Sequence, residues 1–140
     1  MISEKEIIMI HKICKVCSIY DYSINPDGSI DVNGDIDLKH LHLHQLLPLR
    51  FNYVDVNFDC SSNWLISLED CPRHVSGNIN LGTNQLTSLE NSPIELGQYL
   101  YCYKNPLKSL VGYNLSYDKL VCDNKEKLIR KTKLKIIENL

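Results

Sequence analysis

Three tyrosines stand at alternate positions in the stretch YLYCYKN, residues 99–105. In a strand, successive side chains point to opposite faces, so Tyr99, Tyr101 and Tyr103 would share one face while the leucine and cysteine between them share the other. Tyrosine combines a large rigid ring with a hydroxyl and is favoured in protein interfaces. The pattern predicts a binding surface on one face and core on the other, although aromatic rows also stabilise sheets by cross-strand packing.

Histidines and cysteines are the other residues whose spacing suggests ligand binding. His40, His42 and His44 would align three imidazoles on a strand, and imidazole is a ligand for zinc and copper. Neither a carboxylate nor a thiol at close ligand spacing completes that set. Cys14 and Cys17 form C-x-x-C without a second such pair at zinc-finger spacing, so we expect them to pack against the hairpin described below. We therefore predict no metal and no cofactor.

Motifs for catalysis are missing from the sequence. It contains no glycine-rich phosphate loop, no G-x-S-x-G and no acidic pair that stands out from a solvated surface. We therefore expect that the protein is not an enzyme. With 140 residues and 44% hydrophobic content, the chain has the size and composition of one folded domain, residues 1–140.

An internal repeat sets the positions of the tyrosines. Segments that begin at Phe58, Ile79 and Leu100 start 21 residues apart and align without gaps. The matched columns are Cys60, Leu81 and Cys102; Asn63, Asn84 and Asn105; Leu65, Leu86 and Leu107; Ser67, Ser88 and Ser109; and Leu68, Leu89 and Leu110. Each unit reads Φ-x-Φ-x-x-N-x-L-x-S-L, where Φ is an apolar residue, and this is a leucine-rich-repeat pattern.

Such units form a solenoid because one turn cannot bury its own apolar side, whereas stacked turns bury a continuous core. We predict short parallel strands in one sheet, with the asparagines bonding backbone groups left unpaired where the chain leaves each strand. Weaker copies extend the predicted repeats over residues 36–124. The predicted fold class is α/β, a short leucine-rich-repeat-like solenoid with a parallel β-sheet.

Segments outside the repeat are expected to cap both ends of the solenoid. Residues 1–21 contain a predicted helix of about residues 3–19, which starts at the capping box S-E-K-E. Residues 22–35 contain the turn signal Asn-Pro-Asp-Gly between alternating apolar residues, which predicts a β-hairpin that pairs with the edge of the repeat sheet. Residues 125–140 place apolar side chains at helical spacing and predict a helix that covers the last coil.

The repeat, the hairpin sequence INPDGSIDVNGDIDL and the stretch NFDCSSN resemble small leucine-rich-repeat-like proteins of bacteriophage and bacterial genomes, over about residues 22–124. More distantly, the units are similar to the short repeats of bacterial effector proteins, although Glu69, Glu90 and Val111 stand where that group usually has proline. No attached catalytic domain fits in the remaining residues, so an effector ligase activity is not carried over. The phage-like resemblance implies a binding module, and by analogy one that inhibits or redirects a host protein, such as an antiviral defence component.

The residues that alternate with the predicted core positions should face outward on the concave side of the solenoid. From the first coil to the last, this face changes from acidic through amide to aromatic side chains. The predicted partner-binding residues are Asp35, Asp37, Asn57, Asp59, Asn78, Asn80, Tyr99, Tyr101 and Tyr103, with Trp64 extending the surface along one edge. The acidic end favours a protein partner with a basic surface.

Charge is distributed unevenly along the chain. Residues 125–140 carry a balance of +4, which leaves −6 on residues 1–124. A basic C-terminal helix suggests nucleic-acid association, but the acidic repeat face disfavours duplex binding, whose affinity comes largely from phosphate contacts. Self-assembly through the tyrosines or an exposed sheet edge is the other alternative to partner binding.

The N-terminus bears on the compartment. Glu4 and Glu6 are atypical of a secretory signal, and no apolar run in the sequence is long enough to span a membrane. We expect a cytoplasmic protein, in the host-cell cytoplasm if it is encoded by a phage, with its six cysteines reduced.

Overall fold

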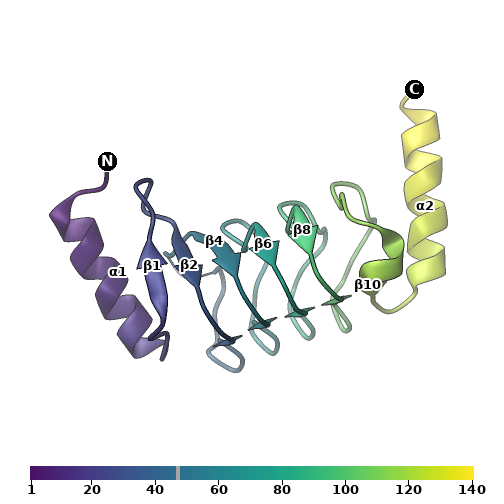
Figure 1. The fold of residues 1–140 in the computed structure, drawn as a ribbon. Coiled ribbons are helices and arrows are strands. Elements are labelled where there is room, and N and C mark those ends of the chain that lie inside the picture. Colours follow the sequence, from purple (N-terminus) through teal and green to yellow (C-terminus); the bar gives the residue numbers. More distant parts are fainter. Residues whose placement is uncertain (47) are drawn as a thin grey trace.

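The computed structural model describes residues 1–46 and 48–140 and shows a short solenoid with one helix at each end (Figure 1). Leu47, inside the predicted repeat range, lies outside the described residues. The helices are α1 (Glu4–Val16), α2 (Lys125–Glu138) and the short 3-10 helix η1 (Tyr117–Lys119). The strands are β1 (Tyr22–Ile24), β2 (Ile30–Val32), β3 (Ile36–Asp37), β4 (Phe51–Val54), β5 (Phe58–Asp59), β6 (His74–Val75), β7 (Ile79–Asn80), β8 (Glu95–Leu96), β9 (Leu100–Tyr101) and β10 (Leu120–Val121). The predicted α/β solenoid is confirmed.

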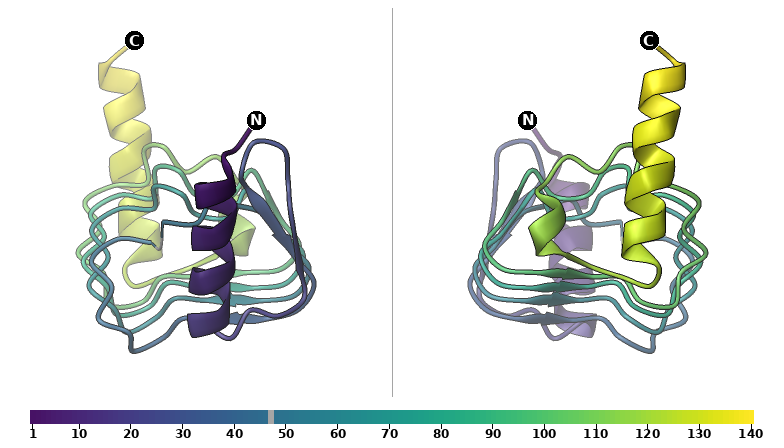
Figure 2. Two further views of the ribbon diagram at one scale, coloured as in Figure 1. Left: turned by 90° about the vertical axis from the view of Figure 1, so that its left-hand side faces the viewer. Right: turned by 90° about the vertical axis from the view of Figure 1, so that its right-hand side faces the viewer.

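The strands form two sheets, whereas the sequence predicted one. Sheet A has the order β1-β2-β4-β6-β8, and sheet B has the order β3-β5-β7-β9-β10. Each central coil contributes one strand to each sheet, and the coils stack in register when viewed from either end (Figure 2). Neighbouring strands are parallel except for the antiparallel pair β1–β2. The prediction missed sheet A because its central strands β6 and β8 each bury a single apolar residue, Val75 or Leu96, which shows no alternation in the sequence. In sheet B, by contrast, buried residues alternate along each coil, as Phe58 and Cys60 do.

The core lies between the two sheets and is built from in-register columns of apolar side chains. In sheet B, the first residues of the strands pair in the order Ile36, Phe58, Ile79, Leu100 and Leu120, and all five are buried. In sheet A, the buried column is Val54, Val75 and Leu96. Each column continues from one coil to the next, so a coil gains its core from its neighbours, as the solenoid prediction required.

The repeated asparagines form a ladder inside the solenoid, which we call the inner asparagine row: Asn63, Asn84 and Asn105. The Oδ1 atom of Asn84 accepts a hydrogen bond from the N–H of Leu65 in the preceding coil at 3.0 Å. Its Nδ2 atom donates to the carbonyls of Cys60 and Leu81, at 3.1 Å each. Asn63 and Asn105 make equivalent bonds. The predicted bonding of backbone groups by these amides is confirmed.

Helix α1 closes the N-terminal end of the core. Ser3 and Glu6 form the predicted capping box, with Ser3 Oγ accepting from the Glu6 N–H and Glu6 Oε2 accepting from the Ser3 N–H. The helix ends earlier than predicted because Ser18 takes a left-handed conformation, φ 57°. Cys14 is buried in the core, and Tyr22 and Ile24 of the hairpin pack against that core, so its predicted packing against the hairpin is confirmed.

The hairpin β1–β2 extends sheet A and not the sheet that carries the tyrosines. Strand β2 pairs in parallel with β4, so the predicted contact with a sheet edge is correct, but the sheet is one that the sequence did not reveal. Gly28 in the hairpin turn has φ 85°, a conformation that glycine adopts without strain.

Helix α2 covers the last coil with only part of its length. Leu128 and Thr132 are buried, and Thr132 Oγ1 accepts from the Leu110 N–H at 2.8 Å. The C-terminal half projects beyond the coils, so Leu134 and Ile137 are exposed (Figure 1). The predicted C-terminal helix is therefore present, and it contacts the last coil through its first half. Within the described residues, neither helix has the length and apolar run that a membrane crossing requires.

Candidate functional site

The tyrosine trio, Tyr99, Tyr101 and Tyr103, lies on the outward side of sheet B at and around β9. Tyr99 is 47% exposed and Tyr103 is 45% exposed, while Tyr101 is half-buried. The rings of Tyr99 and Tyr101 pack at a tilt, with 6.1 Å between their centroids. Leu100 and Cys102, between them, are buried. The alternation predicted from the sequence is therefore present, although the strand itself covers only Leu100–Tyr101.

A row of side chains leads to Tyr99 along one corner of the coils. We call it the corner row: Asp35, Asn57, Asn78 and Tyr99. Asp35 Oδ1 accepts from the Asn57 N–H, Asn57 Oδ1 accepts from the Asn78 N–H, and Asn78 Oδ1 accepts from the Tyr99 N–H, at 2.8 to 3.1 Å. Each polar side chain therefore bonds the backbone of the next coil where the chain turns into sheet B.

A second row leads to Tyr101 along sheet B, and we call it the strand row: Asp37, Asp59, Asn80 and Tyr101. In each polar member, Oδ1 accepts from the backbone N–H two residues later, at 2.9 to 3.2 Å. Asp59 also accepts from the Ser61 hydroxyl at 2.6 Å, and Asp37 lies 3.3 Å from the Lys39 ammonium. Their predicted partner-binding role stays a prediction, because one oxygen of each holds the local turn.

The tyrosines occupy the positions at which both rows of backbone bonds stop. A phenol oxygen lies at the far end of a rigid ring, so it cannot reach the nearby backbone N–H groups that a short carboxylate or amide reaches. In the following coil, the N–H of Lys119 bonds instead to the carbonyl of Ser116 within η1. The rings of Tyr99 and Tyr101 therefore make none of the backbone bonds that the polar members of their rows make.

Trp64 and the histidines pack together at the turn beyond the inner asparagine row. The rings of His42 and His44 each lie 4.9 Å from the Trp64 ring, centroid to centroid. Trp64 remains 47% exposed. His40 and His42 have left-handed backbone conformations, so this segment is a turn and not the strand that would align the imidazoles. Among the described residues, no group of three metal-binding side chains converges.

Two thiols lie behind the tyrosine trio. Cys102 and Cys122 follow the paired residues of β9 and β10, and Cys102 is buried while Cys122 is half-buried. Hydrogen bonding between the two thiols lowers the pKa of Cys122 and, together with burial, raises the pKa of Cys102. Burial also raises the pKa of Cys60, to about 12. Cys122 is thus the member of the pair that more readily becomes a thiolate.

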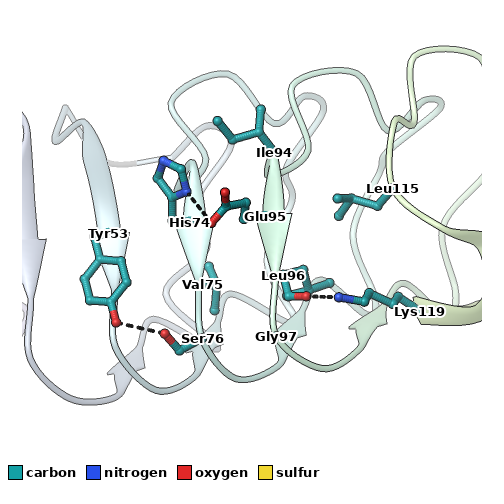
Figure 3. A pocket seen from close by; sticks show the side chains of 10 residues that line it. All are labelled: Tyr53, His74, Val75, Ser76, Ile94, Glu95, Leu96, Gly97, Leu115 and Lys119. Atoms are coloured by element: carbon teal, nitrogen blue, oxygen red, sulfur yellow. Dashed lines mark hydrogen bonds and ion pairs between the residues drawn. The ribbon is translucent and has the colours of Figure 1, made fainter.

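A groove of about 500 Å³ crosses the outward face of sheet A (Figure 3). Three of its polar side chains come from a column that pairs in register: Tyr53, His74 and Glu95. His74 Nδ1 lies 3.3 Å from a Glu95 carboxylate oxygen, and the Tyr53 hydroxyl hydrogen-bonds with Ser76 Oγ at 2.9 Å. Leu115 and Lys119 form the wall contributed by the last coil. Sequence reasoning missed this groove because it depends on the second sheet.

Comparison with known proteins gives no match: no family model, no curated protein and no solved structure matches this chain. The structure itself supports a repeat architecture of parallel strands with a spacing near 21 residues. Assignment of the repeats to a leucine-rich-repeat family rests on the sequence pattern alone.

The two surfaces offer different kinds of contact. The tyrosine trio presents rings and hydroxyls on an open sheet face, which suits a broad protein surface. The groove on sheet A presents an amine, a carboxylate and an imidazole beside apolar side chains and a strand edge, which suits a narrow, extended ligand.

Proposed function

We propose that the protein is a non-enzymatic protein-binding module whose contact surface is centred on the tyrosine trio. The observation that carries this proposal is the break in the corner and strand rows at Tyr99 and Tyr101. The preceding members of both rows bond the backbone, so their polar side chains have a structural explanation. The tyrosine rings have no such explanation, and two of them are almost half exposed.

The rest of the sheet B face supports the same proposal. Asp35, Asp37 and Asp59 give it an acidic end. Asp35 and Asp59 each keep a second carboxylate oxygen beyond the one engaged in a backbone bond, whereas the second oxygen of Asp37 pairs with Lys39. A partner with a basic surface would match that end, while the tyrosines supply the large buried contacts on which protein interfaces depend. The resemblance to phage repeat proteins supports the narrower hypothesis that the partner is a host protein that becomes inhibited or redirected.

The test compares capture of partners from a bacterial lysate by the native chain and by the triple variant Tyr99→Ala, Tyr101→Ala, Tyr103→Ala. The matched control is Tyr20→Ala, which truncates an exposed tyrosine elsewhere. We expect one protein to be captured by the native chain and the control but not by the triple variant. With that protein purified, the triple variant should bind about 100-fold more weakly or worse. Equal capture by a folded triple variant would remove the trio from the binding surface.

The projecting half of α2 favours a second candidate, self-association. Leu134 and Ile137 lie one turn apart and are 56% and 64% exposed, so burying them in a second copy would be favourable. This candidate predicts a mass that increases with protein concentration in sedimentation equilibrium. The variant Leu134→Lys, Ile137→Lys should then be monomeric. A concentration-independent monomer mass for the native chain would reject it.

A further inference from the structure

Sheet A ends one coil before sheet B at the C-terminal side of the solenoid. Strand β8 is the last strand of sheet A, whereas sheet B continues from β9 to β10. The intervening residues 111–119, all described, form turns and the short helix η1 and do not form a further strand of sheet A. The coil from Leu100 to Leu120 is also one residue shorter than the 21-residue repeat. The chain thus leaves the β8 edge without a strand beside it.

The backbone groups of Leu96 point to this free edge. Successive residues of a strand direct their N–H and C=O groups to opposite sides. The N–H of Gly97 donates to Val75 and that of Glu95 to Arg73, toward the interior of the sheet. The backbone N–H and C=O of Leu96 therefore point away from β6, toward the free edge of the sheet. There the Leu96 carbonyl accepts a bond from the Lys119 ammonium (Figure 3). A flexible side chain stands where the N–H of a neighbouring strand would lie.

The groove described above opens beside this edge and already contains the contacts that a further strand would meet. Ile94 and Leu115 supply apolar walls, and Glu95 extends its carboxylate into solvent, with 78% of the side chain exposed. In sheet A, residues in the column of Tyr53, His74 and Glu95 face outward, while those in the column of Val54, Val75 and Leu96 face the core. A strand added at the edge would continue both columns.

We propose that the β8 edge is a docking site for an extended segment of a partner protein, which pairs in parallel with β8 and displaces the Lys119 side chain. The residue paired with Glu95 is basic, because it lies directly beside an exposed carboxylate. The residue paired with Leu96 is aliphatic, because it continues the buried column. The N–H of the residue after it donates to the Leu96 carbonyl, as Gly97 does to Val75.

Glu95 also argues against a second copy of the chain as the occupant. A symmetric pair of β8 edges would be antiparallel and would bring two Glu95 carboxylates close together, which is unfavourable. Lys119 on the edge opposes such pairing as well, in the way that charged side chains protect other free strands. The proposed site is on sheet A, so it is independent of the function proposed for the tyrosine trio.

The experiment titrates the isotope-labelled chain with a synthetic peptide of residues 91–98 that carries Glu95→Lys, to about 2 mM, and follows backbone amides by NMR. We expect shifts at β8 and Lys119, and slower hydrogen exchange of the Leu96 amide. The same peptide with an N-methylated glycine lacks the donor to the Leu96 carbonyl and should bind at least about fivefold more weakly. Equal binding of the N-methylated peptide, or no shift at β8, would overturn the proposal.

Variants of the chain test the two side chains involved. Lys119→Met removes the competing amine while keeping most of the length of the side chain, so it should strengthen peptide binding about two- to tenfold. Glu95→Gln should weaken it about two- to fivefold, and Glu69→Gln, at an exposed acid away from the groove, should leave it unchanged. Weaker binding by Lys119→Met would contradict displacement. A native Leu96 amide already protected in a dimer would show that a second copy occupies the edge.

Discussion

The inner asparagine row and the tyrosine trio lie on neighbouring parts of the same coils but interact with them differently. Asn84 is buried, and the Oδ1 and Nδ2 atoms of its side-chain amide bond backbone groups of two coils. Tyr99 and Tyr103 are exposed near the end of sheet B, where the side-chain-to-backbone bonds of the corner row and the strand row stop. The repeated asparagines thus join neighbouring coils, whereas the tyrosine rings at the end of sheet B make no such bond.

The corner row lies between these two cases. Asn57 and Asn78 bond one backbone N–H each and are only partly buried. Substitutions should therefore reduce stability most in the inner asparagine row, less at the corner-row asparagines, and least in the tyrosine trio. The effect on partner binding should follow the opposite order.

Asn84→Leu should have the largest effect on stability. It removes four bonds and leaves the Leu65 N–H and the Cys60, Leu81 and Gly82 carbonyls without this partner inside the fold. Because each unsatisfied buried group costs about 1–3 kcal/mol, the free energy of unfolding should fall by about 3–5 kcal/mol. Urea unfolding followed by circular dichroism measures this change.

The control for that measurement is Gln85→Ala, which truncates the exposed neighbour and keeps its backbone bond to Leu65. It should change the free energy of unfolding by less than about 0.5 kcal/mol. A similar loss in both variants would mean that the amide ladder contributes little to the stacking of the coils.

Asn78→Ala should have an intermediate effect. It removes the acceptor for the Tyr99 N–H, a single bond of 2.9 Å at a partly exposed corner, so a loss of about 1–2 kcal/mol is expected. Asn78→Asp keeps the accepting oxygen, as Asp35 does at the start of the same row, and should retain most of the stability. If Asp and Ala at this position are equally destabilising, the corner bond is not the cause.

Tyr99→Asn should have a small effect on stability and a large one on binding. It places at this position the residue type found at Asn57 and Asn78, and costs only the ring contact with Tyr101, about 0.5–1 kcal/mol. Capture of the partner should fall sharply because a large contact is lost. An unfolding loss above about 2 kcal/mol would instead assign the ring a structural role.

The last prediction concerns thiol reactivity and needs no substitution: Cys122 should be alkylated faster than Cys17. The bond from the Cys102 thiol lowers the pKa of Cys122, whereas burial raises the pKa of Cys17, which is also half-buried. Since the thiolate is the reactive form, Cys122 should be alkylated by iodoacetamide faster than Cys17. As the pH is lowered, the alkylation rate of Cys122 should begin to fall at a lower pH than that of Cys17. Mass spectrometry of peptides across pH 6–9 measures both rates. Faster alkylation of Cys17 at every pH would contradict the hydrogen bond.

The sequence predicted the coils of sheet B, the inner asparagine row and both helices, because each rests on local patterns. The capping box at Ser3 is contained in four residues, and the stack of Leu100 on Ile79 follows from the repeat. It did not predict the partner of the hairpin or the groove at His74 and Glu95. Both depend on sheet A, whose strands acquire their pairing only when neighbouring coils come together.

The candidate site divides in the same way. Alternation alone placed Tyr99, Tyr101 and Tyr103 opposite the core, since a strand has no other way to arrange them. The tertiary structure decided which polar side chains beside them are hydrogen-bonded, because the N–H that donates to Asn78 belongs to Tyr99 in the next coil. It also left one edge of β8 without a neighbouring strand, because the last coil turns through η1 instead of forming a strand. A repeat therefore determines what each coil contributes, while the contacts between coils and at their ends determine what remains free to bind.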